Sequence, residues 1–290
     1  MEKSMETFNT GNTVRNYRKL SKTLMLVLLF LVAAVQLYPL LWLVLFSFKS
    51  NNDIFGSNVC GLPKVWHFEN YSTALLGGGI LRYFLNSVFY TAITIVVAGV
   101  LSAMSSYAIS RLEWKLKGVT FIVFTLGIMI PLQAVLLPLF LILDKTHILN
   151  TYLALLIPYV AFAIPMSVII LSGFYSSIPK DIEEAAYLDG CGVYQVFFRI
   201  ILPIVKPAIA TVSIFTFLGT WNELMFANTF VNDSALRTLP VGIMSFVGEY
   251  ATNWGAIGAG MVIATLPTIV IYFFLSDQVQ SSIVAGAVKG

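Results

Sequence analysis

Six long apolar runs are the feature of this sequence that most restricts its fold. Each run has about 19–25 residues and none has a long charged interruption. A helix of that length crosses a hydrocarbon layer of about 30 Å. Since a backbone within lipid must satisfy its own hydrogen bonds, helices are the expected form. The runs cover residues 24–46, 86–109, 119–143, 152–174, 209–231 and 257–275.

The composition agrees with a membrane-embedded chain. Of the 290 residues, 58% are hydrophobic and only 11% are charged, whereas soluble domains carry about 25% charged residues. So little charge cannot cover a folded chain of this length in water. We therefore expect an all-α membrane protein with six transmembrane helices and no separate soluble domain.

A basic segment precedes the first run, with Arg15, Arg18, Lys19 and Lys22 close to it. The run is longer than the apolar core of a cleaved signal peptide, about 7–15 residues, and no small-residue cleavage site follows. We expect it to remain as the first span. The predicted organisation is an N-terminal tail at 1–22, a transmembrane domain at 23–278 and a C-terminal tail at 279–290.

Prolines interrupt several of the predicted spans. Neighbouring helices and Ser or Thr side chains in a membrane bundle can satisfy the carbonyls that proline leaves unpaired. Pro131 and Pro138 are expected to break the third span locally. The full set is Pro39, Pro131, Pro138, Pro158, Pro165 and Pro267.

Lys and Arg residues set the orientation, because cytoplasmic loops carry most of them. With both termini inside the cell, twelve of the 17 Lys and Arg residues lie in inner segments. The remaining five lie outside. The inner set is Lys3, Arg15, Arg18, Lys19, Lys22, Arg111, Lys115, Lys117, Lys180, Arg199, Lys206 and Lys289, and the outer set is Lys49, Lys64, Arg82, Lys145 and Arg237.

The inner loop at residues 175–208 departs from this rule, because residues 180–189 carry a net charge of −3. Pro179 suits a first helical turn, and the acidic residues after it suit the positive end of a helix dipole. Gly190 and Gly192 allow the left-handed conformation that ends a helix. The residues alone leave two readings open: a short acidic helix that docks on a basic groove of a cytoplasmic partner, or a solvated connecting helix.

The same loop carries a longer pattern. It begins with Glu184-Ala185-Ala186, and three residues separate this triplet from Gly190. Nine residues then separate Gly190 from Ile200, which is followed after one residue by Leu202-Pro203. This resembles the complete EAA signature of the permease subunits of bacterial ABC importers. Beyond the loop, the Trp221-Asn222-Glu223 triplet and the ending at residues 285–290 resemble the maltose-permease-like subunit of carbohydrate importers.

The resemblance implies a type I (MetI-like) ABC importer fold with a cytoplasmic coupling helix. It implies that Glu184 contacts a cation on the ATP-binding subunit, that Ala185 and Ala186 are close-contact positions, and that Gly190 allows the turn that seats the helix. The expected ATPase-coupling residues are Glu184, Ala185, Ala186, Asp189, Gly190, Ile200, Leu202 and Pro203.

The resemblance also implies the partners: a second, different permease chain, two ATP-binding subunits, and an extracellular or periplasmic solute-binding protein. The expected location is the bacterial inner membrane. No phosphate-binding loop of the G-x-x-x-x-G-K-[ST] type occurs, so ATP and magnesium are expected on the partner subunits. We expect a non-catalytic chain with no cofactor and no metal, since Cys60, Cys191, His67 and His147 are widely separated.

Asn222 and Glu223 are candidates for a substrate pathway. A carboxylate within a span is costly and should face a cavity or a partner. Glu223 therefore either lines the pathway or holds two helices together, and the sequence leaves both readings open. Trp221 and Trp254 are expected as interfacial anchors, and Gly255, Gly258, Ala259 and Gly260 as sites of close helix packing.

Two other functions remain open. One is an ABC importer permease for another solute, such as glycerol phosphate, an amino acid or a peptide, although the ending at 285–290 favours sugar importers. The other is a carrier driven by an ion gradient. That class usually shows intramembrane charges and inverted repeats, and here only Glu223 lies inside a predicted span.

Overall fold

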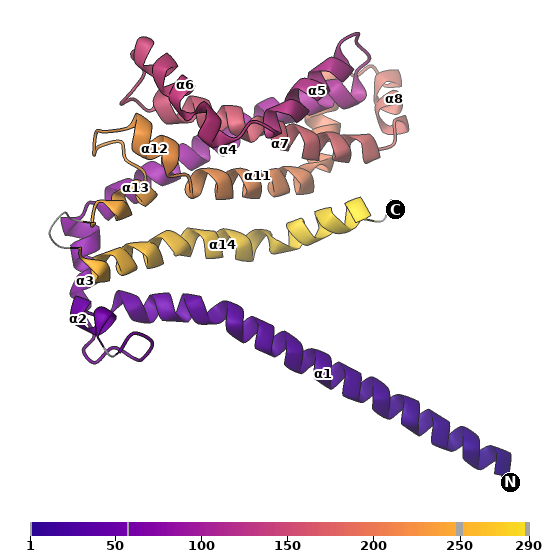
Figure 1. Cartoon of the computed structure of the whole chain (residues 1–290). Helices are drawn as coiled ribbons and strands as arrows, with labels where there is room; N and C mark the ends of the chain where they lie inside the picture. Colours follow the sequence, from indigo (N-terminus) through magenta and orange to yellow (C-terminus); the bar gives the residue numbers. More distant parts are fainter. Residues whose placement is uncertain (1, 57, 248–251, 288–290) are drawn as a thin grey trace.

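The computed structural model describes the backbone of residues 2–56, 58–247 and 252–287, and side chains within residues 21–274 of those ranges. This part of the chain is helical, with one isolated antiparallel bridge between Val247 and Thr252 (Figure 1). The elements are α1 (Glu2–Ser47), α2 (Asn51–Phe55), α3 (Glu69–Ser72), η1 (Thr73–Gly77), α4 (Ile80–Arg111), α5 (Lys117–Ile128), α6 (Leu132–Lys145), α7 (Leu153–Ser177), α8 (Asp181–Leu188), α9 (Val193–Gln195), η2 (Val196–Ile201), α10 (Leu202–Ile204), α11 (Lys206–Trp221), α12 (Met225–Phe230), α13 (Leu239–Met244) and α14 (Trp254–Ala287).

Four helical segments in the described residues are long and apolar enough to cross a membrane. Two bent helix pairs meet the same criteria if each pair is one span, which raises the number to six, as predicted. One pair is α5 with α6, bent by 100°, and the other is Val193–Ile204 with α11, bent by 75°. The four single segments are Ser21–Ser47, Ile80–Arg111, Leu153–Ser177 and Trp254–Phe274.

The third run is therefore not the straight helix that hydropathy suggests, and the fifth run, at 209–231, is divided between α11 and α12. The third breaks before Leu132, where Pro131 lacks an N–H and restricts Ile130 to extended conformations. The expected break at Pro138 is wrong, because that residue lies inside α6. The other four prolines also lie inside helices: Pro39 in α1, Pro158 and Pro165 in α7, and Pro267 in α14.

The segments predicted as terminal tails continue the helices beside them. Residues 2–22 belong to α1, and α14 runs on to Ala287. The place of both segments outside the membrane stays a prediction. Residues 288–290, part of the ending that resembles sugar permeases, lie outside the described residues.

The centre of the bundle is the pair α4 and α7, which pack against each other along much of their length. Small hydroxyl residues at this contact let the two backbones approach closely. Ser106 Oγ lies 2.6 Å from Ser102 O and 3.2 Å from Val168 O across the interface, so one hydroxyl can satisfy carbonyls of both helices. Helix α11 covers α4 and α7, and α14 covers α11.

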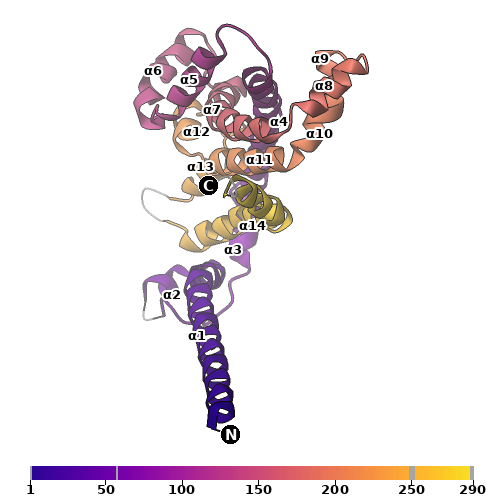
Figure 2. The same cartoon turned by 90° about the vertical axis from the view of Figure 1, so that its right-hand side faces the viewer.

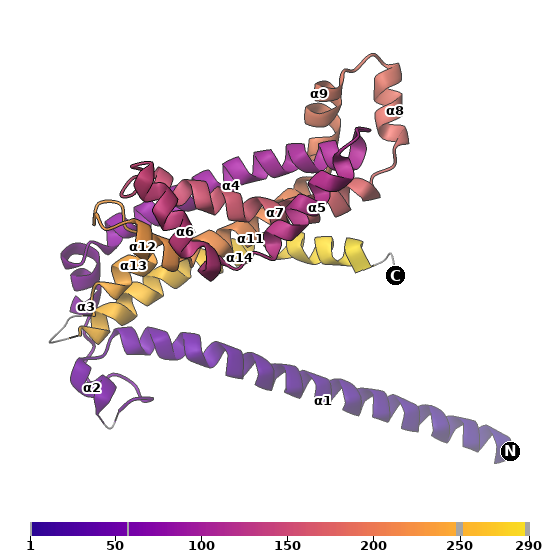
Figure 3. The same ribbon diagram turned by 45° about the horizontal axis from the view of Figure 1, so that its top comes forward.

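Two parts of the chain project from this bundle. Helix α1 contacts α14 near its C-terminal end and then diverges, so its apolar side chains at 24–32 are exposed (Figures 1 and 3). Helices α8, α9 and α10 protrude beyond the ends of α4 and α7 (Figures 2 and 3). They belong to residues 175–208, which the sequence predicts as an inner loop.

The predicted close packing at the start of α14 is confirmed at Gly258. A Cβ atom there would lie 2.6 Å from Phe46 Cδ1 and 3.1 Å from the Ser47 Cα of α1. The glycine thus lets the ends of α1 and α14 touch.

We expect Gly258→Leu to destabilise the purified chain by about 1–3 kcal/mol, because the added side chain forces α1 away from α14. The measurement is the thermal unfolding midpoint in detergent. Gly173→Leu is the matched control, since Gly173 lies within α7 and a Cβ atom added there would have no other atom within 4 Å. Equal losses in both variants would contradict a packing role specific to Gly258.

Candidate functional site

Helix α8 forms where the acidic segment predicts a helix. Asp181, Glu183 and Glu184 occupy its first turn, where negative charge suits the helix dipole. The helix ends at Leu188, and Gly190 just beyond it has a left-handed φ of 84°, as predicted. The same expectation for Gly192 is wrong: its φ is −77°, and its N–H donates to the Gln195 side-chain oxygen at the start of α9.

The two faces of α8 differ. Glu184, Ala185 and Leu188 are exposed, and Leu188 is 89% exposed. Ala186 is only 6% exposed and packs in a cluster with α7 and η2. Ala186 therefore packs in the core of its own chain, and its expected contact with a partner stays a prediction.

The other residues of the EAA pattern divide in the same way. Asp189 is exposed at the end of α8, and Pro203 is exposed in α10. Ile200 and Leu202 are partly buried against the same cluster as Ala186, around the fully buried Ile201. The pattern thus combines an exposed patch, which we define as Glu184, Ala185, Leu188 and Asp189, with residues that fix its orientation.

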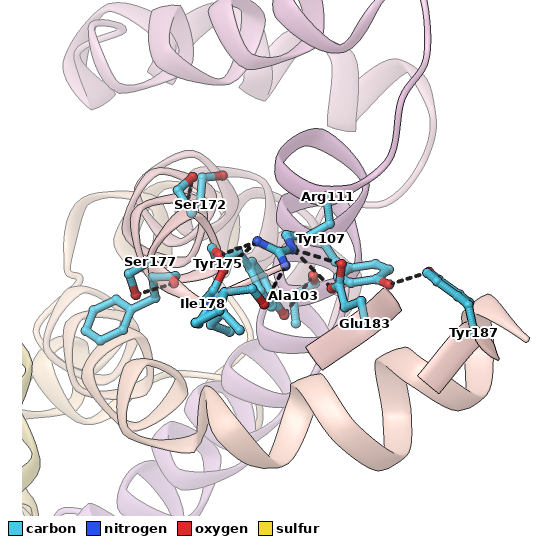
Figure 4. A network of polar contacts seen from close by, with 12 residues as sticks. Ala103, Tyr107, Arg111, Ser172, Tyr175, Ser177, Ile178, Glu183 and Tyr187 are labelled. Carbon is cyan, nitrogen blue, oxygen red and sulfur yellow. Dashed lines mark hydrogen bonds and ion pairs between the residues drawn. The ribbon is translucent and has the colours of Figure 1, made fainter. Parts of the chain in front are cut away.

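A buried ion pair connects α8 to the membrane helices (Figure 4). Arg111, the last residue of α4, donates from Nε to both carboxylate oxygens of Glu183 at 3.1 Å. The side chains are 3% and 8% exposed. Sequence analysis missed this pair: Arg111 counted only as an inner positive charge, and Glu183 only as part of the acidic segment.

A second feature is a cavity of about 500 Å³ between α5, α7, α11 and α12. Its walls are mainly apolar, and the α5–α6 break lies at its edge through Ile130 and Pro131. Polar groups converge on it from two helices and the α11–α12 connection. They are Tyr159, Ser167, Thr216, Thr220 and Glu223.

Glu223 explains why the fifth run is interrupted. Helix α11 ends at Trp221, and the Glu223 carboxylate accepts hydrogen bonds from the Phe226 and Ala227 amides at 2.8 and 3.1 Å. These are free N–H groups at the start of α12, which a carboxylate satisfies well. The Tyr159 hydroxyl of α7 donates to the same carboxylate at 2.8 Å.

The structure separates the other two residues of the triplet from this cavity. Asn222 is exposed, and its side chain donates to Leu218 O of its own helix. Trp221 is 3% exposed and donates to Ala264 O of α14, so its expected role as an interfacial anchor is wrong. Trp254, at the start of α14, packs edge-on against Phe55 and stays partly exposed.

Metal ligands do not gather in the part of the chain that the structure describes. No group of three or more His, Cys, Asp or Glu side chains there could hold a metal ion. Cys60 and Cys191 are both free. The described candidate sites are therefore the exposed patch of α8, the Arg111–Glu183 pair and the cavity.

Comparisons with known proteins give one family match. Residues 95–284 match the family described as binding-protein-dependent transport system inner membrane component. A probable ABC transporter permease of Bacillus subtilis is 42% identical over 271 residues, covering 93% of this chain and 90% of that protein.

Two further relatives carry substrate names. The trehalose/maltose transport system permease of Thermococcus litoralis is 33% identical, covering 93% of this chain and 98% of the relative. A diacetylchitobiose uptake system permease of Streptomyces coelicolor is also 33% identical, with coverage of 90% and 87%. A crystal structure of a bacterial ABC transporter involved in alginate import has a chain with the same fold, at TM-score 0.78, 23% identity and coverage of 89% and 96%.

Proposed function

Because the chain belongs to the family of binding-protein-dependent transport system inner membrane components, we propose that it is a membrane-spanning permease subunit of an ATP-driven sugar importer. The observation that carries this function is the exposed patch of α8. It protrudes from a bundle of membrane helices and matches the position of the EAA signature. A short acidic surface of this kind is suited to a basic groove on another subunit.

The sugar class comes from the relatives. The names of several refer to carbohydrates: diacetylchitobiose, trehalose and maltose, and starch degradation products. These relatives are aligned over most of this chain, including the cavity and α8. We therefore propose a mono- or oligosaccharide as the transported solute.

The partners follow from this role. The chain pairs with a second, different permease, two ATP-binding subunits bind from the cytoplasm, and a solute-binding protein docks outside. Glu184 contacts a cation on one ATP-binding subunit, and Ala185, Asp189 and Gly190 lie at the same contact. ATP and magnesium bind to the partners, and this chain itself catalyses no reaction.

The distribution of Lys and Arg residues supports an orientation with both termini and α8 on the cytoplasmic side of the inner membrane. The cavity beside Glu223 is then part of the solute pathway. Its apolar walls suit a sugar ring face, and its hydroxyl and carboxylate groups suit sugar hydroxyls. Closure of the ATP-binding subunits moves α8, and the two permeases rock about the pathway.

Uptake into proteoliposomes tests this function. The complete importer, with its binding protein, is supplied with labelled maltose, trehalose and chitobiose in separate assays. Uptake should require internal ATP and the ATP-binding subunit, and a proton or sodium gradient alone should give none. Uptake of a sugar by this chain alone, driven by an ion gradient, would replace the proposal with a secondary carrier.

A further inference from the structure

We propose that Arg111 and Glu183 form a positioning pair that makes α8 move as one body with the inner ends of α4 and α7. The inference rests on the proposed function, because it concerns how movement of α8 reaches the membrane helices. Neither residue belongs to the exposed patch that would contact an ATP-binding subunit. Their role is to transmit movement, not to bind the partner.

The guanidinium of Arg111 lies where three segments meet (Figure 4). Nε faces the Glu183 carboxylate of α8, and one terminal nitrogen donates to Tyr175 O at 3.3 Å and Ile178 O at 2.9 Å, at the end of α7. The other terminal nitrogen donates to Pro179 O at 3.3 Å. One side chain from α4 thus holds the end of α7, the connection and the start of α8.

Arginine suits this junction better than lysine. Its planar guanidinium presents several donors in a fixed arrangement, whereas an ammonium acts as a compact point charge. The positive charge also suits the free carbonyls at the C-terminus of α7, and Glu183 suits the N-terminus of α8. Arg111 therefore complements the end of α7, and Glu183 complements the start of α8.

Few other contacts hold the start of α8. Only Ile178, Pro179 and Lys180 connect it to α7, and Ala186 supplies its main buried contact. The hydroxyls of Tyr107 and Tyr187 meet at 3.5 Å, a weak contact. Without the ion pair, the start of α8 would be held to α4 and α7 mainly by this short connection and the Ala186 contact.

The burial of the pair makes it sensitive to small changes. Removing one partner of a buried ion pair leaves the other charge uncompensated, which is far more harmful than losing an exposed pair. The nearby pair Glu113–Lys117 provides the comparison. This pair lies at the connection between α4 and α5, where Lys117 Nζ is 2.7 Å from Glu113 Oε2, and the Glu113 side chain is 78% exposed. The Lys117 hydrogen bond holds the pKa of Glu113 below its usual value, so this carboxylate is also charged.

The test uses the complete importer in nanodiscs or proteoliposomes with three readouts. They are the amount of ATP-binding subunit that co-purifies, the rate of ATP hydrolysis, and the number of sugar molecules imported per ATP hydrolysed. The variants are Glu183→Gln and Arg111→Lys. Glu183→Gln keeps the size of the side chain and removes its charge, whereas Arg111→Lys keeps the charge and loses the fixed arrangement of donors. Glu113→Gln is the matched control.

Glu183→Gln should retain the ATP-binding subunit and hydrolyse ATP, while the sugar imported per ATP falls on the order of tenfold, since misplacement by about 1 Å can cost that much or more. The number of sugar molecules that Arg111→Lys imports per ATP should lie between the values of Glu183→Gln and wild type. Combining Glu183→Gln with Arg111→Gln should lower the ratio at least as far as Glu183→Gln alone, because the side chain that joins α4, α7 and α8 is then lost as well. Glu113→Gln should match wild type.

An unchanged ratio in Glu183→Gln would overturn the inference, and so would an equal loss in Glu113→Gln. Failure of Glu183→Gln to fold, together with a normal ratio in Arg111→Lys, would also overturn it, since the pair would then serve stability alone. A different result identifies an error in the proposed function itself: a wild-type chain that imports sugar with no ATP-binding subunit.

Discussion

Replacing Glu184 with lysine is expected to abolish ATP-driven uptake while the chain remains folded and inserted in the membrane. Glu184 is exposed, and no hydrogen bond or ion pair of its side chain occurs within the described structure. The substitution should therefore change the stability of the folded chain very little. At a contact with a basic groove, reversal of one charge places two like charges together, which costs several kcal/mol.

Three measurements check this expectation: the amount of the variant in the membrane, its thermal unfolding midpoint, and uptake by the complete importer. Glu113→Lys is the control, because it reverses an exposed charge at the same end of the bundle that is not part of the exposed patch of α8. It should reduce uptake only slightly. Normal uptake by Glu184→Lys would rule out α8 as the contact that couples transport to ATP hydrolysis.

Glu223 is expected to give the second large effect, through two separable roles. In Glu223→Ala, the Tyr159 hydroxyl and the two α12 amides lose a charged acceptor. Leaving such donors unsatisfied costs about 1–3 kcal/mol each, so α12 and the wall of the cavity should be strongly destabilised. The measurement is again the thermal unfolding midpoint.

Glu223→Gln separates structure from transport. The two α12 amides donate to different oxygens of the Glu223 carboxylate, so the single amide oxygen of glutamine keeps one of these bonds while the charge beside the cavity is gone. We expect a raised KM for sugar uptake, with a smaller fall in the unfolding midpoint than in Glu223→Ala. A normal KM would mean that Glu223 only holds α7 and α12 together. Asn222→Ala is the neighbouring control, expected to change stability by less than about 0.5 kcal/mol, because its bond stays within its own helix.

These expectations show where sequence reasoning was sufficient. The apolar runs predict a helical membrane bundle because the lipid requirement leaves few alternatives. The short helix α8 is also readable, since its acidic first turn and Gly190 are local signals. Pro131 correctly predicts the interruption of the third run, because proline acts on its own backbone and its predecessor.

Other features depend on contacts between distant segments. Hydropathy cannot reveal that Glu223 caps a new helix, so the run at 209–231 looks continuous. Arg111 and Glu183 are separated by 72 positions, and only the packing of α4 on α7 brings them together. A helical pattern likewise cannot tell which alanine faces inward: Ala185 and Ala186 look equivalent in the sequence, but only Ala186 is buried.

The most direct test of the central claim is affinity purification of the tagged chain from native membranes in mild detergent. The account predicts that a second permease and an ATP-binding subunit co-purify with it. It also predicts that Glu184→Lys keeps the permease and loses the ATP-binding subunit. A wild-type chain that purifies alone and still transports sugar when reconstituted alone would contradict the account.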